Sequence, residues 1–245
     1  CADFGGGYLE AATSADHSFT GTVVGASISF SLWVYLSSTA DQTLISKFGG
    51  IDGYNLAIYN APLKPPELAF SIWDQPVNPP VAPNGCWYTS LAGGTPQALV
   101  TGKWQHIVAI FDNVAVQPCV ARIYIDGVNT NATVDTTYDL MGGNAYTATK
   151  FRLGSRGAGT GAIPYSGKMD EVSIWSKALT AGEVATIFAA GVVTTTADLT
   201  GESGLESWYR FKATDDFTGT ANGIVDELGN SDLTAGGTVS SAPVV

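Results

Sequence analysis

The sequence predicts an all-β protein, a two-layer sandwich of strands that carries one short helix. Three observations favour this fold class. Most apolar segments alternate with a period of two, Gly-, Pro- and Asn-rich turns separate them, and only one segment has helical periodicity. All-β sandwiches of 245 residues commonly form a single unit, so we expect one core.

The clearest predicted strand is segment 28–36, in which apolar even-numbered residues alternate with Ser29, Ser31, Trp33 and Tyr35. This alternation predicts one face on the core and one half-covered face. Segments 104–112 and 119–125 alternate in the same way, and the pair Asp126-Gly127 predicts a tight turn after the second of them. Further strands are expected at 42–48, 54–59, 67–73, 150–153, 167–175 and 206–211.

The predicted helix lies within LTAGEVATIFAAG, residues 179–191. Thr180 suits the N-cap, and Glu183 three residues later completes a capping box. Gly191 ends the helix.

A change of composition near 194–204 separates residues 1–196, the main sandwich, from a tail of residues 197–245. A segment of about fifty residues is too short for a comfortable core of its own. We therefore expect the tail to add strands to the same sandwich or to contact a neighbouring subunit.

Several motifs follow one another in a specific order: ADFGGGYLE, FSLWVYLSS, GKWQHIVAIFDN, ARIYIDGV and SGKMDEVSIWSKALTAGEVATIF. In this order they resemble the laminin G-like, or concanavalin A-like, jelly-roll family over residues 2–191. The tail resembles a segment that closes such modules in structural proteins of tailed phages. The resemblance implies a jelly-roll sandwich and a component of a virion surface.

The net charge is −11, only 13% of residues are charged, and no run of Lys or Arg is present. This balance argues against nucleic-acid binding, and no apolar run reaches the eighteen or so residues of a membrane span. The chain starts at Cys1, and Tyr8-Leu9-Glu10 already resembles a strand, which favours a trimmed N-terminus over a lipid anchor. Cys86 and Cys119 flank a predicted strand pair, and either a bridge or free thiols fit their spacing.

Catalysis is considered because the jelly-roll family includes glucan hydrolases, which need two carboxylates on one face. Asp170 and Glu171 are adjacent, so on a regular strand they point to opposite faces. Asp215-Asp216 and Asp226-Glu227 fail for the same reason, and we expect no enzyme.

A structural calcium ion at Asp170 is a hypothesis, because Asp170 shares its predicted face with Val172 and Ile174 and would be buried. The alternative, which we favour, is a carboxylate that accepts loop N–H groups or pairs with a base.

Sugar binding would use aromatic side chains that stack on the apolar face of a pyranose ring. Candidates are Trp73, at the start of a Pro-rich loop, Trp87 and Tyr88 just past its end, and Tyr54 on a neighbouring strand.

We therefore expect a non-catalytic carbohydrate-binding or adhesion module, displayed on a virion or cell surface. The alternative is a purely structural virion component, such as a decoration, fibre or tail protein, whose partners are neighbouring subunits.

Overall fold

The structure is a computed structural model of the 245-residue chain. It describes residues 1–13, 15–18, 27–48, 53–60, 66–74, 84–89, 98–112, 120–130, 133–137, 149–156, 163–191 and 198–244. For residues 73–74, 84–89 and 133–137 the description covers the backbone alone.

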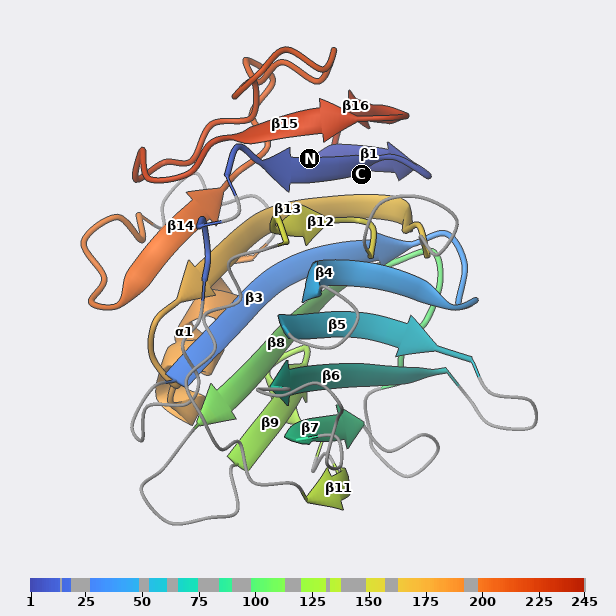
Figure 1. The fold of residues 1–245 in the computed structure, drawn as a ribbon, viewed down its shortest axis with the longest axis vertical. Coiled ribbons are helices and arrows are strands. Elements are labelled where there is room, and N and C mark those ends of the chain that lie inside the picture. The colour runs from blue at the N-terminus through green and yellow to red at the C-terminus, as the bar shows by residue number, and fades with distance from the viewer. Residues whose placement is uncertain are drawn as a thin grey trace.

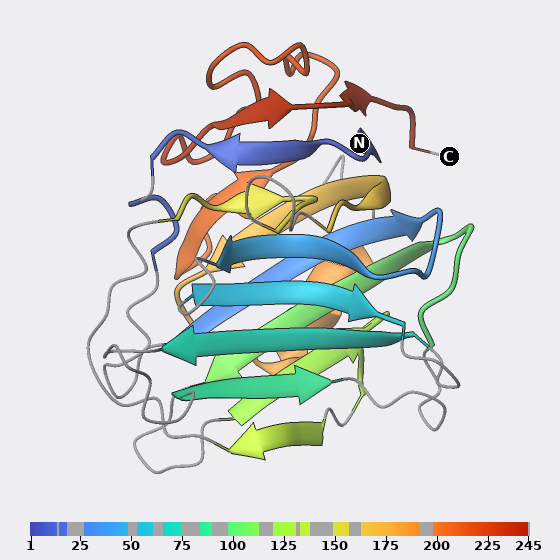
Figure 2. The ribbon, with the colours of Figure 1, turned by 45° about the vertical axis from the view of Figure 1, so that its right-hand side comes forward.

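Two large antiparallel sheets form the molecule and lie face to face, with their strands crossing at an angle (Figures 1 and 2). In spatial order, sheet A comprises β10 (Val128–Asn129), β9 (Val120–Ile125), β8 (Trp104–Asp112), β3 (Ser27–Leu36), β13 (Ser166–Trp175), β1 (Ala2–Gly5) and β16 (Val239–Ser241), with β14 (Leu205–Tyr209) also paired to β13. Sheet B comprises β11 (Thr133–Thr137), β7 (Asn84–Thr89), β6 (Glu67–Asp74), β5 (Gly53–Tyr59), β4 (Gln42–Phe48), β12 (Arg152–Leu153), β2 (Tyr8–Ala11) and β15 (Leu233–Gly236).

The alternation of apolar and polar residues along the strands predicts which side chains enter the core between the sheets. On β3 the apolar even-numbered residues, from Ile28 to Leu36, are buried between the sheets, and the odd-numbered residues face outward. On β8 the core side carries Ile107, Ala109 and Phe111. The all-β prediction is therefore confirmed, and the two sheets share one core.

The helix α1 (Ala181–Ala190) packs on the outer face of sheet A. Thr180 and Glu183 form the predicted capping box, with the Thr180 hydroxyl and the Glu183 carboxylate each accepting a main-chain N–H of the other residue. Val184 fills the contact between the helix and a second apolar cluster that includes Val108, Ile110 and Trp208. The helix therefore covers this part of the outer face of sheet A.

The tail adds strands to both sheets of its own chain. β14 pairs with β13, β15 pairs with β2 and β16 pairs with β1, so the first two strands of the chain each lie beside a strand of the tail. Figure 1 shows β15 and β16 next to the N-terminal strand at one end of the sandwich.

No helix in the described part of the chain has the length and apolar character that crossing a membrane requires.

Candidate functional site

The outer face of sheet B, turned away from sheet A, carries a row of directly paired positions that crosses all eight strands (Figure 2). From the β11 edge to the β15 edge, the row comprises Thr136, Trp87, Ser71, Asn55, Ser46, Arg152, Glu10 and Thr234.

The middle of this row points away from the core. The chain neighbours of Asn55, Tyr54 and Leu56, both lie in the core, so Asn55 faces outward. Ser46, paired to Asn55, follows the core residue Ile45 and faces outward as well.

Among the described residues, three side-chain oxygens on this face lack a hydrogen-bond partner: Thr43 Oγ1, Ser46 Oγ and Asn55 Oδ1. All three residues are at most 3% exposed. A β-bulge between Thr43 and Ile45 lets both Leu44 and Ile45 enter the core, which keeps Thr43 and Ser46 on the same outer face. An unsatisfied buried acceptor costs about 1–3 kcal/mol, so unpaired oxygens at these three positions reduce the stability of the fold. We call these three residues the polar floor.

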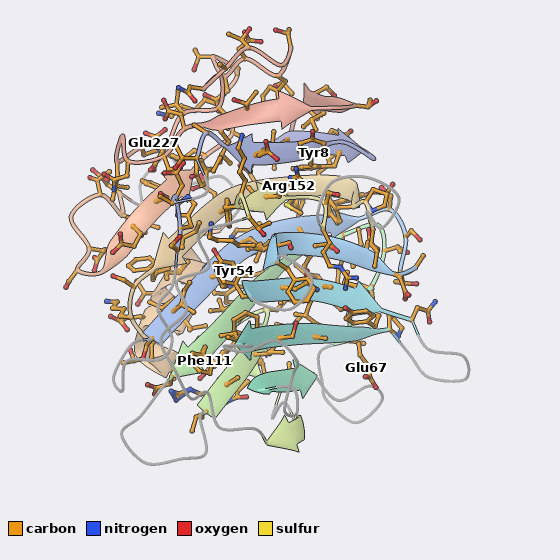
Figure 3. All side chains as sticks on the ribbon, viewed as in Figure 1. Tyr8, Tyr54, Glu67, Phe111, Arg152 and Glu227 are labelled. Atoms are coloured by element: carbon orange, nitrogen blue, oxygen red, sulfur yellow. The ribbon has the colours of Figure 1, made fainter. Side chains whose placement is uncertain are left out.

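Aromatic and charged side chains flank the polar floor. Arg152 donates to Glu10 at 2.6 Å and its guanidinium lies 4.9 Å from the centre of the Tyr8 ring. Figure 3 shows Tyr8 and Arg152 close together on neighbouring strands. On the other side, Arg156 lies 5.4 Å from the ring centre of Phe48. The face thus combines unpaired acceptors, fixed donors and aromatic rings.

Three of the four aromatic residues predicted to bind a sugar lie on strands of sheet B. Trp73 lies near the end of β6 and pairs with Gly53 on β5. Trp87 and Tyr88 lie on β7. Their side chains lie outside the described part of the structure, as does residue 119, so the Cys86–Cys119 bridge stays a prediction.

The prediction that Tyr54 binds a sugar is wrong. Tyr54 is fully buried, its ring lies 5.1 Å from that of Phe30, and its hydroxyl donates to the His17 carbonyl at 2.9 Å. Burial raises the pKa of Tyr54 well above its usual value. Figure 3 shows Tyr54 in the interior, where no ligand at the surface can stack on it.

Asp170 does not share a face with Val172 and Ile174, as a regular strand would require. A bulge between Asp170 and Ser173 inserts one residue, and Glu171 takes it up with a left-handed φ of 49°. Asp170 is paired with Trp33 on the outer face of sheet A, whereas Val172 and Ile174 stay in the core. The expectation that the two adjacent acids point to opposite faces is wrong, because the bulge leaves both on the outer side of sheet A. Glu171 accepts there from Trp208 Nε1 at 2.8 Å and from Arg210 Nε at 3.2 Å.

Asp170 has main-chain partners of the kind expected as the alternative to calcium, and the calcium ion stays a hypothesis. One carboxylate oxygen accepts the Glu171 N–H at 3.0 Å, and the other lies 3.7 Å from the main-chain nitrogen of Cys1. Burial raises the pKa of Asp170 to about 7. Within the described ranges, no three His, Cys, Asp or Glu side chains gather to hold a metal ion.

Ser31 and His106 form a hydroxyl–imidazole pair of the kind that acts as nucleophile and base in some enzymes, but both residues are buried. Ser31 Oγ lies 2.8 Å from His106 Nε2, and both residues are fully buried. Phe188 of α1 stacks on His106, and Trp33 covers it from the side. Burial lowers the pKa of His106 to about 3. No substrate reaches this pair, so it serves packing.

Two packed antiparallel sheets, with one helix on the outer face of one of them, suggest a comparison with known proteins. The family profile of the concanavalin A-like lectin/glucanases superfamily matches residues 5–185. The chain belongs to the concanavalin A-like superfamily. Its sequence matches no curated protein.

Solved structures agree with this assignment of the fold. A protein from Bacteroides ovatus, proposed to bind carbohydrate, superposes with a TM-score of 0.65 at 19% identity over 100% of this chain. The chain spans only 60% of the length of that protein. A heptameric SAP-like pentraxin from Limulus polyphemus superposes with a TM-score of 0.56 at 12% identity, over 96% of this chain and 93% of its own. At these identities the concanavalin A-like fold alone carries over.

Proposed function

We propose that this concanavalin A-like chain binds carbohydrate without cleaving it, through the outer face of sheet B. The observation that carries the proposal is the set of partly exposed side chains on this face, where Arg152 and Glu10 lie beside the Tyr8 ring and Arg156 lies beside the Phe48 ring. Guanidinium and carboxylate groups can donate to and accept from the hydroxyl groups of a glycan.

The rest of the face suits the same ligand. Tyr8 and Phe48 flank the floor, and the backbone of Trp73 and Trp87 lies on the adjoining strands β6 and β7. Aromatic rings stack on the apolar face of a pyranose, and the polar groups then fix its orientation. Trp73 and Trp87 therefore remain our candidates for stacking. Tyr88 pairs with the core residue Phe70, so its register position is on the inner face of sheet B and it is no longer a candidate. The superfamily to which the chain belongs is named for lectins and glucanases, and a structural neighbour is a proposed carbohydrate-binding protein.

The absence of cleavage is part of the proposal. The adjacent acids Asp226 and Glu227 have different partners: Glu227 binds Lys212 at 2.7 Å, while Asp226 is buried among main-chain donors. We further propose display outside a cell or on a virion, where a low share of charged residues and a glycan-binding face are useful.

A glycan array followed by affinity electrophoresis tests the proposal. Wild type should be retarded by at least one immobilised glycan, and a Trp73→Ala, Trp87→Ala double variant should lose most of that retardation. Trp104→Ala is the matched control, because Trp104 is a half-exposed tryptophan on sheet A.

Three results would count against the proposal. Wild type could bind no glycan, which would favour the purely structural role with neighbouring subunits as partners. Trp104→Ala could abolish binding as strongly as the double variant. Release of reducing sugar from a bound glycan would contradict the non-catalytic part.

A further inference from the structure

A separate pocket of about 350 Å³ lies where the tail meets residues 15–18, at one end of β13 and β14. We call it the tail pocket; its lining includes Asp16, Ile174, Trp175, Glu206, Asn230 and Ser231. Its strand residues belong to sheet A, so it is distinct from the outer face of sheet B. Its volume lies in the range of small-ligand sites.

The tail wall of the pocket is held in place by one buried carboxylate. Asp226 accepts hydrogen bonds from five donors at 2.8–3.2 Å: Ser207 Oγ and the main-chain N–H groups of Trp208, Leu228, Asn230 and Ser231. Asp226 is only 2% exposed. The segments that carry Glu206 and Asn230 are therefore fixed before any ligand arrives.

A chain of hydrogen bonds ties the opposite wall to the tail. His17 Nε2 lies 2.9 Å from the Tyr209 hydroxyl, which in turn donates to the Ser231 carbonyl at 2.6 Å. Burial lowers the pKa of His17 to about 4, so its ring is uncharged at neutral pH. Among the described residues that line the pocket, none is Lys or Arg.

The lining offers acceptors above an apolar floor. Asp16 and Glu206 contribute carboxylates, and the Asn230 amide is oriented by its bond from Nδ2 to the Glu206 carbonyl at 2.8 Å. Ser231 is 8% exposed, and its hydroxyl has no hydrogen-bond partner among the described residues. The base of the pocket includes the apolar residues Ile174 and Trp175, each 2% exposed, and the Trp175 indole N–H is bound to Ser173 Oγ at 2.9 Å.

We propose that the tail pocket is a second ligand site, which takes one pyranose unit without negative charge, either neutral or amino-bearing. Hydroxyl or ammonium groups bond to the acceptors at the rim, while the apolar face of the ring lies toward the apolar base of the pocket. Two carboxylates, with no Lys or Arg among the described lining residues, repel uronic acids, sialic acids and phosphate groups. Two separate sites on one chain let a branched or repeating glycan bind with avidity.

The test is an NMR titration of the full chain, labelled with ¹⁵N, with methyl glucoside, N-acetylglucosamine, glucosamine and glucuronate. We expect at least one of the first three sugars to shift the amides of residues 174–176, 206 and 230, and glucuronate to leave them unchanged. Glu206→Gln should weaken that binding about tenfold, because a hydrogen bond to a charged acceptor is worth more than one to an amide. Glu202→Gln, an exposed tail carboxylate outside this pocket, is the control and should bind like wild type.

The proposal fails if none of the first three sugars shifts these amides, if glucuronate binds equally well, or if Glu206→Gln has no effect. Asn55→Ala separates it from the proposed function: binding lost in Asn55→Ala but kept in Glu206→Gln would place the sugar on sheet B. Asp16 and Glu206 both line the pocket, and two carboxylates that flank a glycosidic bond can hydrolyse it. Cleavage of an oligosaccharide that requires both would overturn the assignment as a holding site.

Discussion

Asp226 should contribute strongly to the free energy of unfolding, because it accepts five hydrogen bonds in a buried position. Replacing it with Ala leaves several buried N–H groups without an acceptor. We expect Asp226→Ala to lower the free energy of unfolding by at least about 3 kcal/mol, measured by urea denaturation. Glu227→Ala, one residue away, removes only a partly exposed ion pair with Lys212 and should cost less than about 1 kcal/mol. Equal losses in the two variants would contradict this role of Asp226.

His106 should make stability depend on pH. Its folded pKa is about 3, below the usual 6.5, so between these values the unfolded chain takes up a proton that the folded chain does not. Stability is therefore lost as the pH falls. Between pH 7 and pH 4.5, His106 should lower the free energy of unfolding by roughly 2 kcal/mol.

The comparison of wild type with His106→Gln isolates this term. Asp170 acts with the opposite sign, because its raised pKa favours proton uptake by the folded chain, but it is common to both proteins. The free energy of unfolding of His106→Gln should fall less between pH 7 and pH 4.5. An identical fall in both proteins would show that His106 does not remain neutral when folded.

Single residues also show where the sequence stops being informative. A period of two placed the apolar residues of β3 and β8 correctly, because regular strands obey it. The same period misplaced Asp170, since the bulge at Glu171 shifts every later residue to the other face. The polar floor was missed: alternation marks Ser46 and Asn55 as outward-facing, but only coordinates reveal that their oxygens lack partners.

Among the elements, α1 depends on its first turn. Thr180→Ala removes the hydroxyl that accepts the Glu183 N–H and should lower the free energy of unfolding by about 1 kcal/mol. Thr186→Ala is the control, because Thr186 is exposed and its hydroxyl bonds within the helix to the Gly182 carbonyl. Urea denaturation measures both, and a larger loss in Thr186→Ala would refute the capping role.

Long strands with strong alternation were predictable, and β4 agrees residue for residue with segment 42–48. Short strands were not. β15 and β16 have four and three residues, and their pairing with β2 and β1 joins segments more than 200 residues apart. Too few residues are present in such short segments for alternation to specify a partner, although Leu233 and Val239 are buried in the common core.

For the molecule as a whole, the tail should be an integral part of a single chain. Tyr209, Phe211, Ile224 and Leu233 are buried in the common core. Limited proteolysis of the monomeric fraction from size exclusion should therefore leave residues 198–244 uncut. Rapid cleavage there in the monomer, with protection only in an oligomer, would mean that the tail pairs with a neighbouring subunit.

The central claim is that the outer face of sheet B, with the polar floor at its centre, binds glycan. The most direct test measures both stability and glycan affinity in Asn55→Ala, against Asn129→Ala on sheet A as the matched control. The account predicts that Asn55→Ala unfolds at an equal or higher urea concentration than wild type while its affinity for the retained glycan falls about tenfold. Lower stability with unchanged affinity would show that Asn55 serves only the fold, and would contradict the account.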